Sequence, residues 1–107
     1  MMTVEEPYEV YRTSTADKHL EEIVRYVQEC SGIAAALRVL DRIEEACEHL
    51  ALFPRLGAVS RRPTLARRGY RMLVVGRYLL VYKVDDAARR VLIHGIFYYR
   101  QEYQGLL

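Results

Sequence analysis

No run of apolar residues in this 107-residue sequence approaches the roughly 18 to 20 residues that span a bilayer. The opening stretch MMTVEEPYEVYRT has neither the basic segment nor the apolar segment of a secretory signal. Both absences favour a cytoplasmic protein with no membrane partner. The length accommodates one hydrophobic core, so we expect a single domain over residues 1–107.

Cysteine is scarce, and the common catalytic motifs are missing. Cys30 and Cys47 are separated by 17 positions, a spacing that fits no zinc site. The sequence also has no glycine-rich phosphate loop and no G-x-S-x-G nucleophile elbow. We therefore expect no metal and no cofactor, and we expect both thiols to be reduced and to behave as small apolar groups within helices.

Acidic residues are absent from residues 54–84, which contain seven arginines and one lysine. Residues 1–53 contain eleven acidic and five basic residues, so the formal net charge of the chain is only +2. The stretch RRPTLARRGYR, residues 61–71, holds five of the arginines. Such a patch attracts polyanions or acidic surfaces even when the whole molecule is nearly neutral. The alternative is that these arginines pair with the acidic residues of the N-terminal half.

Hydrophobic periodicity predicts a strand followed by two helices. YEVYRT, residues 8–13, alternates in the manner of a half-buried strand. Ser14 and Asp17 form a capping-box-like start, and a helical stripe then extends to about Cys30. Ser31-Gly32 interrupts the pattern. A second stripe runs down about five helical turns and consists of Ala36, Leu40, Ile43, Cys47 and Leu50. The two helices should form a hairpin.

Three strands are predicted in the second half of the chain. LFPRLG ends the hairpin, and AVSRRPTLARRG, residues 58–69, should be an irregular surface loop. The strands should cover residues 70–75, 78–84 and 90–99, with Gly76-Arg77 as a two-residue turn. The sequence thus predicts an α+β fold of order β-α-α-β-β-β, in which the helical hairpin packs on one face of a mainly antiparallel twisted sheet.

Four stretches in this order resemble one known superfamily: YEVYRTSTADKHLEEIVRYV, LFPRLG, GYRMLVVGRYLLVYKVD and VLIHGIFYYRQEYQGLL. They are similar to the ParE/RelE toxins of bacterial type II toxin-antitoxin modules, which include plasmid stabilisation proteins. The resemblance extends from Tyr8 to Leu107 and implies a RelE/ParE-like fold. It implies one of two activities, since ParE-like members bind DNA gyrase and trap its cleaved complex, whereas RelE-like members cut messenger RNA on the ribosome. A third interpretation is a degenerate member that binds only its antitoxin.

The groups needed for a ribonuclease are incomplete. Such an enzyme uses a base at the 2′-hydroxyl, a proton source for the 5′-oxygen and cations around the phosphate. The resemblance implies an arginine where Leu79 stands, a second basic residue where Leu73 stands and often a histidine where Tyr98 stands. A tyrosine, with a reference pKa of about 10, is a poor base at neutral pH. These departures favour a ParE-like gyrase inhibitor that is not an enzyme.

Five groups would remain for the ribonuclease alternative: Arg71, Arg77, Tyr98, Tyr99 and Arg100. Arg77 lies two positions before Leu79, which places both on one strand face if the hairpin is regular. Tyr98 and Tyr99 end a strand, where aromatic residues more often pack on a sheet than take part in chemistry. His94 lies in the middle of the same strand and is expected to be either a structural or a surface residue.

The resemblance also implies protein partners. A cognate antitoxin, with an acidic amphipathic C-terminal segment, would wrap across the helices and the sheet and form a toxin-antitoxin hetero-oligomer. DNA gyrase is the expected target, with the ribosome and messenger RNA as the alternative. The residues expected to bind the target or the antitoxin are Arg61, Arg62, Arg67, Arg68, Arg71, Arg77, Arg100 and Tyr103. Tyr103 should form a helical turn with Leu106 and Leu107, which either packs on the sheet or belongs to the target-binding surface.

Overall fold

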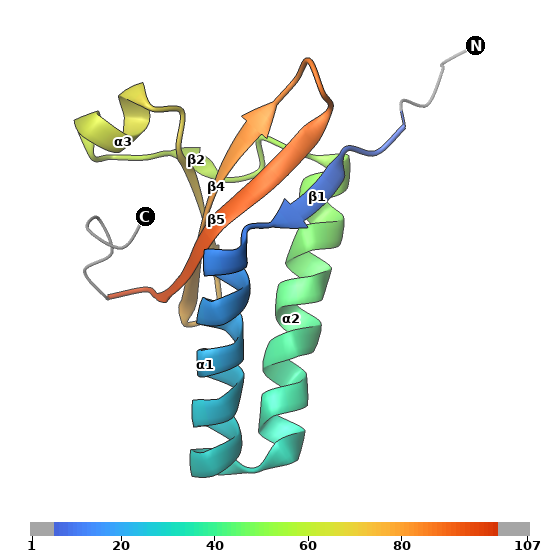
Figure 1. Cartoon of the computed structure of the whole chain (residues 1–107), viewed down its shortest axis with the longest axis vertical. Helices are drawn as coiled ribbons and strands as arrows, with labels where there is room; N and C mark the ends of the chain where they lie inside the picture. The colour runs from blue at the N-terminus through green and yellow to red at the C-terminus, as the bar shows by residue number, and fades with distance from the viewer. Residues whose placement is uncertain (1–5, 101–107) are drawn as a thin grey trace.

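The structure is a computed structural model that describes residues 6–100. Its elements, in chain order, are β1 (Glu9–Arg12), α1 (Ser14–Ser31), α2 (Ile33–Leu52), β2 (Ala58–Val59), α3 (Pro63–Arg67), β3 (Arg71–Val75), β4 (Tyr78–Asp85) and β5 (Arg90–Tyr98). The strands form one sheet in the order β1-β5-β4-β3-β2 (Figure 1). The pairing of β1 with β5 is parallel and the other three pairings are antiparallel. The predicted α+β class and the order of the main elements are confirmed.

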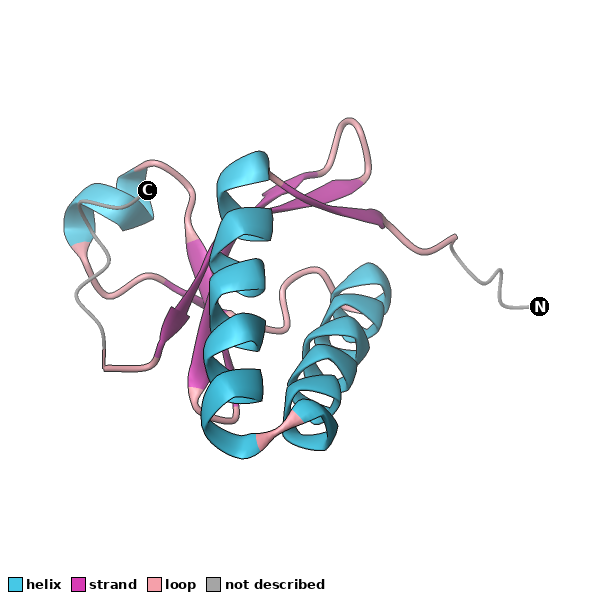
Figure 2. Cartoon of the chain, turned by 60° about the horizontal axis from the view of Figure 1, so that its bottom comes forward, coloured by secondary structure: helices cyan, strands magenta, loops and turns pink. Residues whose placement is uncertain are grey.

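The two long helices form the predicted hairpin (Figure 2). The side chain of Thr13, not Ser14, caps α1, because its hydroxyl accepts a hydrogen bond from the Ala16 amide at 3.1 Å. The predicted capping box is therefore wrong, and Asp17 pairs instead with Arg12 of β1 at 2.7 Å. Gly32 separates the helices with φ of +88°, a conformation that a residue without a side chain adopts at little cost.

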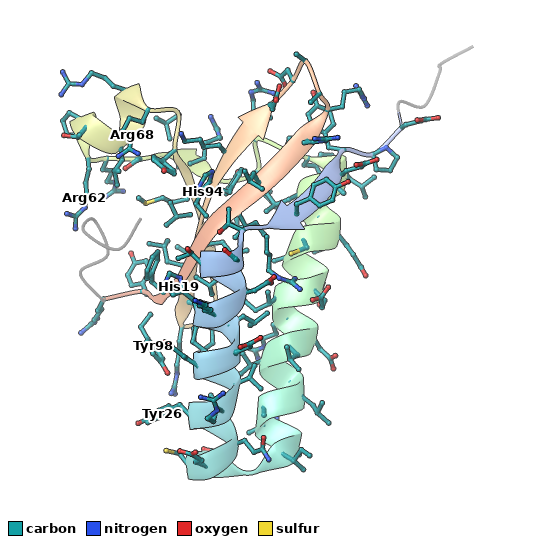
Figure 3. The ribbon with its side chains drawn as sticks, in the orientation of Figure 1. His19, Tyr26, Arg62, Arg68, His94 and Tyr98 are labelled. Atoms are coloured by element: carbon teal, nitrogen blue, oxygen red, sulfur yellow. The ribbon has the colours of Figure 1, made fainter. Side chains whose placement is uncertain are left out.

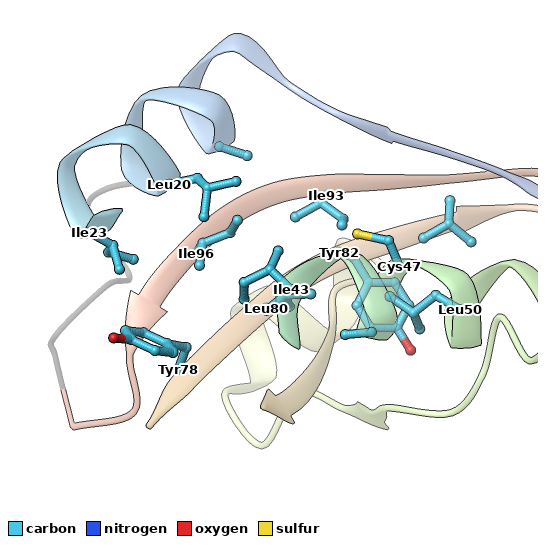
Figure 4. Packing of buried hydrophobic residues seen from close by; sticks show 13 residues of the cluster. Leu20, Ile23, Ile43, Cys47, Leu50, Tyr78, Leu80, Tyr82, Ile93 and Ile96 are labelled. Carbon is cyan, nitrogen blue, oxygen red and sulfur yellow. The ribbon is translucent and has the colours of Figure 1, made fainter. Parts of the chain in front are cut away.

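Both helices pack on the same face of the sheet, as predicted. The main core joins apolar residues of α1 and α2 to those of β4 and β5 (Figure 4); its members include Leu20, Ile23, Ile43, Leu50, Tyr78, Leu80, Tyr82, Ile93 and Ile96. Burial of such a side chain contributes about 1.5 to 3 kcal/mol. Cys47 lies in this core, whereas Cys30 is exposed, so the expectation of a buried thiol is confirmed only for Cys47.

The segment predicted to be an irregular loop contains β2 and α3, and that prediction is wrong. Pro63 occupies the first turn of α3, where its missing amide hydrogen has no cost. Leu65 of α3 is 1% exposed and packs in a second, smaller core with Tyr70, Leu79, Val81 and Phe97. This second core lies on the face of the sheet opposite the helical hairpin, because alternate residues of β4 point to opposite faces.

A bulge in the pairing of β4 with β5 makes this second core possible. The register shifts between Val81 and Tyr82, which leaves His94 opposite no residue of β4. As a result Ile93 and Ile96 both face the helices, although three positions separate them. Within residues 6–100, no helix is long and apolar enough to cross a membrane.

Candidate functional site

Four of the residues predicted for a ribonuclease meet at one end of the sheet. The turn Gly76-Arg77 lies beside the end of β5, because Tyr78 pairs with Tyr98 and the Tyr99 amide donates to the Arg77 carbonyl at 2.8 Å. A pocket of about 500 Å³ is lined there by Val74, Gly76, Arg77, Tyr98, Tyr99 and Arg100. The structure thus brings two guanidinium groups and two phenols together, and we call this place the turn pocket.

The turn pocket is suited to holding an anion and poorly suited to removing a proton. The described residues that line it include no His, Asp or Glu. Behind it, the rings of Tyr78 and Tyr98 lie 5.4 Å apart, and burial, together with Tyr98, raises the pKa of Tyr78. A phenol with a raised pKa stays protonated at neutral pH, so it can donate a hydrogen bond but does not act as a base.

Arg71, the fifth predicted group, lies away from the turn pocket. It pairs with Tyr82, at the opposite end of β3 from Val75, which flanks the turn. Its guanidinium donates to the Gly57 carbonyl at 2.7 Å from Nη2 and 3.1 Å from Nε, and to the Arg55 carbonyl at 3.3 Å. Arg71 therefore fastens the segment that follows α2 to the sheet.

Leu79 points away from any open site. It is 5% exposed and lies in the second core with Leu65 and Phe97. Arg77 lies in the predicted two-residue turn, just before β4 begins at Tyr78, so it is not part of the strand that carries Leu79. Leu73, at the other position where a cation was expected, packs against the main core on the opposite face.

The arginines of the basic segment surround α3. Arg61 and Arg62 precede the helix, Arg67 ends it, and Arg68 follows it. Arg62 is partly buried and its amide donates to the Ser60 hydroxyl at 3.2 Å, whereas the other three are exposed. Figure 3 shows Arg62 and Arg68 beside α3. The burial of Leu65 holds α3, and with it these arginines, against the sheet.

A cluster of cations and aromatic rings continues from α3 onto the sheet. The Arg68 guanidinium lies 5.3 Å and the Lys83 ammonium 4.5 Å from the centre of the Tyr70 ring. The rings of Tyr70 and His94 lie nearly perpendicular to each other, with their centroids 5.3 Å apart. Burial, and then the nearby Lys83 and Arg68, lowers the pKa of His94. The sequence pattern alone does not point to Tyr70 or Lys83 as site residues. The alternation of side chains along a strand could have placed Lys83 on the same face as Leu79 and Val81.

Within residues 6–100, no acidic side chain forms an ion pair with the exposed arginines in and beside α3. In the described part of the chain, ion pairs join Arg12 to Asp17 and Glu44, and Arg55 to Asp86. None of these pairs engages Arg61, Arg67 or Arg68. Within residues 6–100, these three arginines therefore do not pair with the acidic residues of the N-terminal half, and that alternative is not supported.

A second, largely apolar groove lies between α1 and β5, and sequence analysis had assigned it no role. It has a volume of about 440 Å³ and is lined by His19, Glu22, Ile23, Tyr26, Ile96, Phe97 and Tyr98. Figure 3 shows His19, Tyr26 and Tyr98 along it. Tyr26 is 58% exposed, so an apolar partner could cover it. Tyr103, the remaining predicted site residue, and its expected helical turn lie outside the described residues.

Comparisons with known proteins agree on a family. A family model described as the ParE toxin of the type II toxin-antitoxin system parDE matches residues 10–103. A chromosomal ParDE toxin-antitoxin system from P. aeruginosa contains a chain of the same fold, with 20% sequence identity, a TM-score of 0.70 and coverage of 88% of this chain and 98% of that one.

The toxin-antitoxin complex RelBE2 from Mycobacterium tuberculosis also contains a similar chain. Its sequence identity is 25% and its TM-score 0.63, over 90% of this chain and 95% of that one. No curated protein sequence matches the chain.

Proposed function

Because the chain belongs to the ParE toxin family of type II toxin-antitoxin systems, we propose that it arrests bacterial growth by binding DNA gyrase and that a cognate antitoxin neutralises it. In this proposal the protein acts through contacts and has no hydrolytic chemistry of its own. Membership of the family supports the toxin function, and the gyrase target rests on the argument that follows.

The observation that carries the proposal is the burial of Leu79. A cation that stabilises the charge on a scissile phosphate must reach that phosphate. Position 79 is instead part of the second core, covered by Leu65 of α3. Arg71 is held by two backbone carbonyls, and the described lining of the turn pocket contains no carboxylate or imidazole. These features support binding in preference to cleavage.

A ribosome-dependent ribonuclease is the second candidate, and the turn pocket is the observation in its favour. Arg77 and Arg100 line the same space as Tyr98 and Tyr99. In that case Arg77 would replace the cation that position 79 does not provide, while a tyrosine would donate the proton to the leaving oxygen.

For the antitoxin we propose the groove between α1 and β5. A segment that is amphipathic can place its apolar side chains along Ile23, Tyr26 and Ile96. Such contacts supply most of the binding free energy in peptide grooves, whereas charges mainly set the association rate. Both solved relatives bear the names of toxin-antitoxin systems, which supports a hetero-oligomer of this kind.

Parallel assays with the purified chain test the target. With gyrase, relaxed plasmid and ATP, we expect loss of supercoiling and accumulation of cleaved DNA, and with programmed ribosomes we expect intact message. Arg77→Ala separates the candidates further. Loss of one transition-state contact costs about 100- to 1000-fold in a ribonuclease, whereas an ordinary interface residue costs less than about tenfold. Arg25→Ala, an exposed arginine of α1, is the matched control. Message cleavage together with unaffected gyrase would overturn the proposal.

A further inference from the structure

The exposed face of α3 and the adjoining sheet surface carry cations without the apolar groove that a peptide would need. We call the set Arg61, Arg67, Arg68 and Lys83 the basic platform. The one large apolar residue of α3, Leu65, points toward the sheet and is 1% exposed. The surface that a partner meets is thus a short convex helix that presents guanidinium groups.

The basic platform is held in place. Leu65 anchors α3 in the second core, and the Tyr70 amide donates to the Leu65 carbonyl at 3.1 Å. Arg68 and Lys83 both lie over the Tyr70 ring, so their side chains lose little further freedom when they meet an anion. Ordering of a long side chain at an interface costs conformational entropy, and Arg68 and Lys83 have already lost much of that freedom.

The charge of the basic platform has no counterpart within residues 6–100. None of the ion pairs in this part of the chain involves its three arginines, and no acidic residue occurs between positions 54 and 84. Four like charges on one surface repel one another, and a polyanion relieves that repulsion. The observation therefore points to a ligand with several regularly spaced negative charges.

We propose that the basic platform binds the phosphate backbone of double-stranded DNA, independently of base sequence. A duplex backbone offers about one negative charge per 1.7 Å and needs no apolar pocket. Single-stranded nucleic acid is a poorer match, because such strands are held by bases stacked on exposed aromatic rings. The aromatic ring of this cluster, Tyr70, is only 3% exposed and lies beneath the cations.

An acidic peptide is also a poorer match, since its affinity comes mainly from apolar side chains in a groove. The described apolar groove lies between α1 and β5, whereas the basic platform lies on the face opposite the helical hairpin. Binding of DNA by the basic platform can be tested separately from binding of gyrase, because the assay contains neither gyrase nor antitoxin.

The test is the salt dependence of binding to a short labelled duplex, measured by fluorescence anisotropy with the full chain. We expect binding that weakens steeply between about 50 and 200 mM salt. The slope of log Kd against log salt should fall by about 0.9 for each phosphate contact removed, hence by about 1.8 for the double variant Arg61→Gln/Arg67→Gln. These two side chains are exposed, so the variant should keep the melting temperature of the wild type.

The matched control is Arg25→Gln/Arg38→Gln, which removes two exposed arginines of the helical hairpin and should leave the slope unchanged. A second pair, Arg68→Gln and Lys83→Gln, repeats the measurement on the cations that contact Tyr70. Three results would overturn the proposal: no binding to the duplex at low salt, equal slope changes in platform and control variants, or displacement of the duplex by polyglutamate at matched charge. A clear preference for the single strand over the duplex would also exclude it.

Discussion

Leu79 and Arg71 show how neighbours determine the role of a single residue. Both lie in the part of the chain where the sequence suggests nucleic acid chemistry. Leu79 is covered by Leu65 and Phe97, and Arg71 is occupied by the carbonyls of Gly57 and Arg55. Gly57 in turn fits closely against the sheet, since a Cβ atom there would lie 2.4 Å from the Met72 carbonyl oxygen. Leu79 thus belongs to the second core, whereas Arg71 and Gly57 join the segment after α2 to the sheet.

The Tyr82 hydroxyl provides a prediction at this scale. It accepts a hydrogen bond from the buried Gly57 amide at 2.9 Å. Tyr82→Phe leaves that amide without a partner, so we expect a loss of about 1 to 3 kcal/mol in the free energy of unfolding. Urea denaturation measures it. Tyr78→Phe is the control, since in the described part of the chain no hydrogen bond engages its hydroxyl. Equal losses in the two variants would contradict the assigned hydrogen bond.

At the scale of elements, α3 matters most for the surface that the molecule presents. It has five residues and is held by one buried leucine, so its stability is local. The long helices, by contrast, share the main core with β4 and β5. The arginines of α3 therefore depend on a smaller set of contacts than the rest of the fold does.

Truncation of Leu65 should release α3 without unfolding the whole chain. Leu65→Ala removes a fully buried side chain, a change that costs about 2 to 5 kcal/mol in a packed core. We expect trypsin to cleave after Arg67 and Arg68 much faster than in the wild type, while the main thermal transition is retained. Leu37→Ala, whose leucine is 53% exposed on α2, should leave the cleavage rate unchanged. Unaltered cleavage in the Leu65 variant would show that α3 is held by other contacts.

The contact between α1 and β5 predicts a dependence on pH. His19 Nδ1 accepts a hydrogen bond from the Ile96 amide at 3.3 Å, and burial lowers the pKa of His19, although Glu22 opposes the shift. The unfolded state therefore binds a proton more readily, and the free energy of unfolding should be highest above pH of about 6.5 and decrease as the pH falls through that value. The lowered pKa of His94 acts in the same direction.

Urea denaturation at about pH 7.5 and about pH 5.5 measures this effect. His19→Asn keeps an acceptor near the Ile96 amide and removes the titration, so the difference between the two pH values should shrink. His49→Asn, an exposed residue of α2, should leave it unchanged. An unchanged difference in the His19 variant would contradict the role of this contact.

Sequence patterns were sufficient for the long elements and insufficient for the short ones. The stripe of α2 extends over enough residues to show a period, and β4 is a long run of apolar residues typical of a buried strand. Five residues with one large apolar member, Leu65, are too few to show a helical period, so the sequence pattern does not predict α3. The sequence also gives no sign of the bulge at Val81/Tyr82, and this bulge determines which residues of β5 face α3. The sequence predicted four residues of the turn pocket, Arg77, Tyr98, Tyr99 and Arg100. It did not predict that Arg71 lies at the other end of β3, away from this pocket.

The whole molecule has two chemically different sides. The helical hairpin covers one face of the sheet and borders the apolar groove, whereas α3 and the basic platform cover the other (Figures 1 and 2). The molecule measures 49 × 35 × 21 Å, which is about two to five times the Debye length of about 10 Å in 0.1 M salt. A partner near one side therefore responds to the local charge more than to the net charge of +2.

Ion-exchange chromatography tests this separation of charge. At neutral pH and moderate ionic strength, we expect stronger retention on a sulfonate resin than a net charge of +2 would give, because the basic platform can face the resin. Arg61→Gln/Arg67→Gln should elute at clearly lower salt than Arg25→Gln/Arg38→Gln, although both variants lose two positive charges. Coincident elution of the two variants would show that net charge alone governs retention.

The parallel pairing of β1 with β5 ties the order of synthesis to the completion of the fold. Glu9 is placed opposite Arg90, so 81 positions of chain must be translated before the first strand can meet its neighbour. At about 5 to 20 residues per second, that interval lasts roughly 4 to 16 seconds. The groove beside β5 cannot exist before the last strand is made. If the groove holds the antitoxin as proposed, an antitoxin can bind the nascent chain there only after β5 has been made.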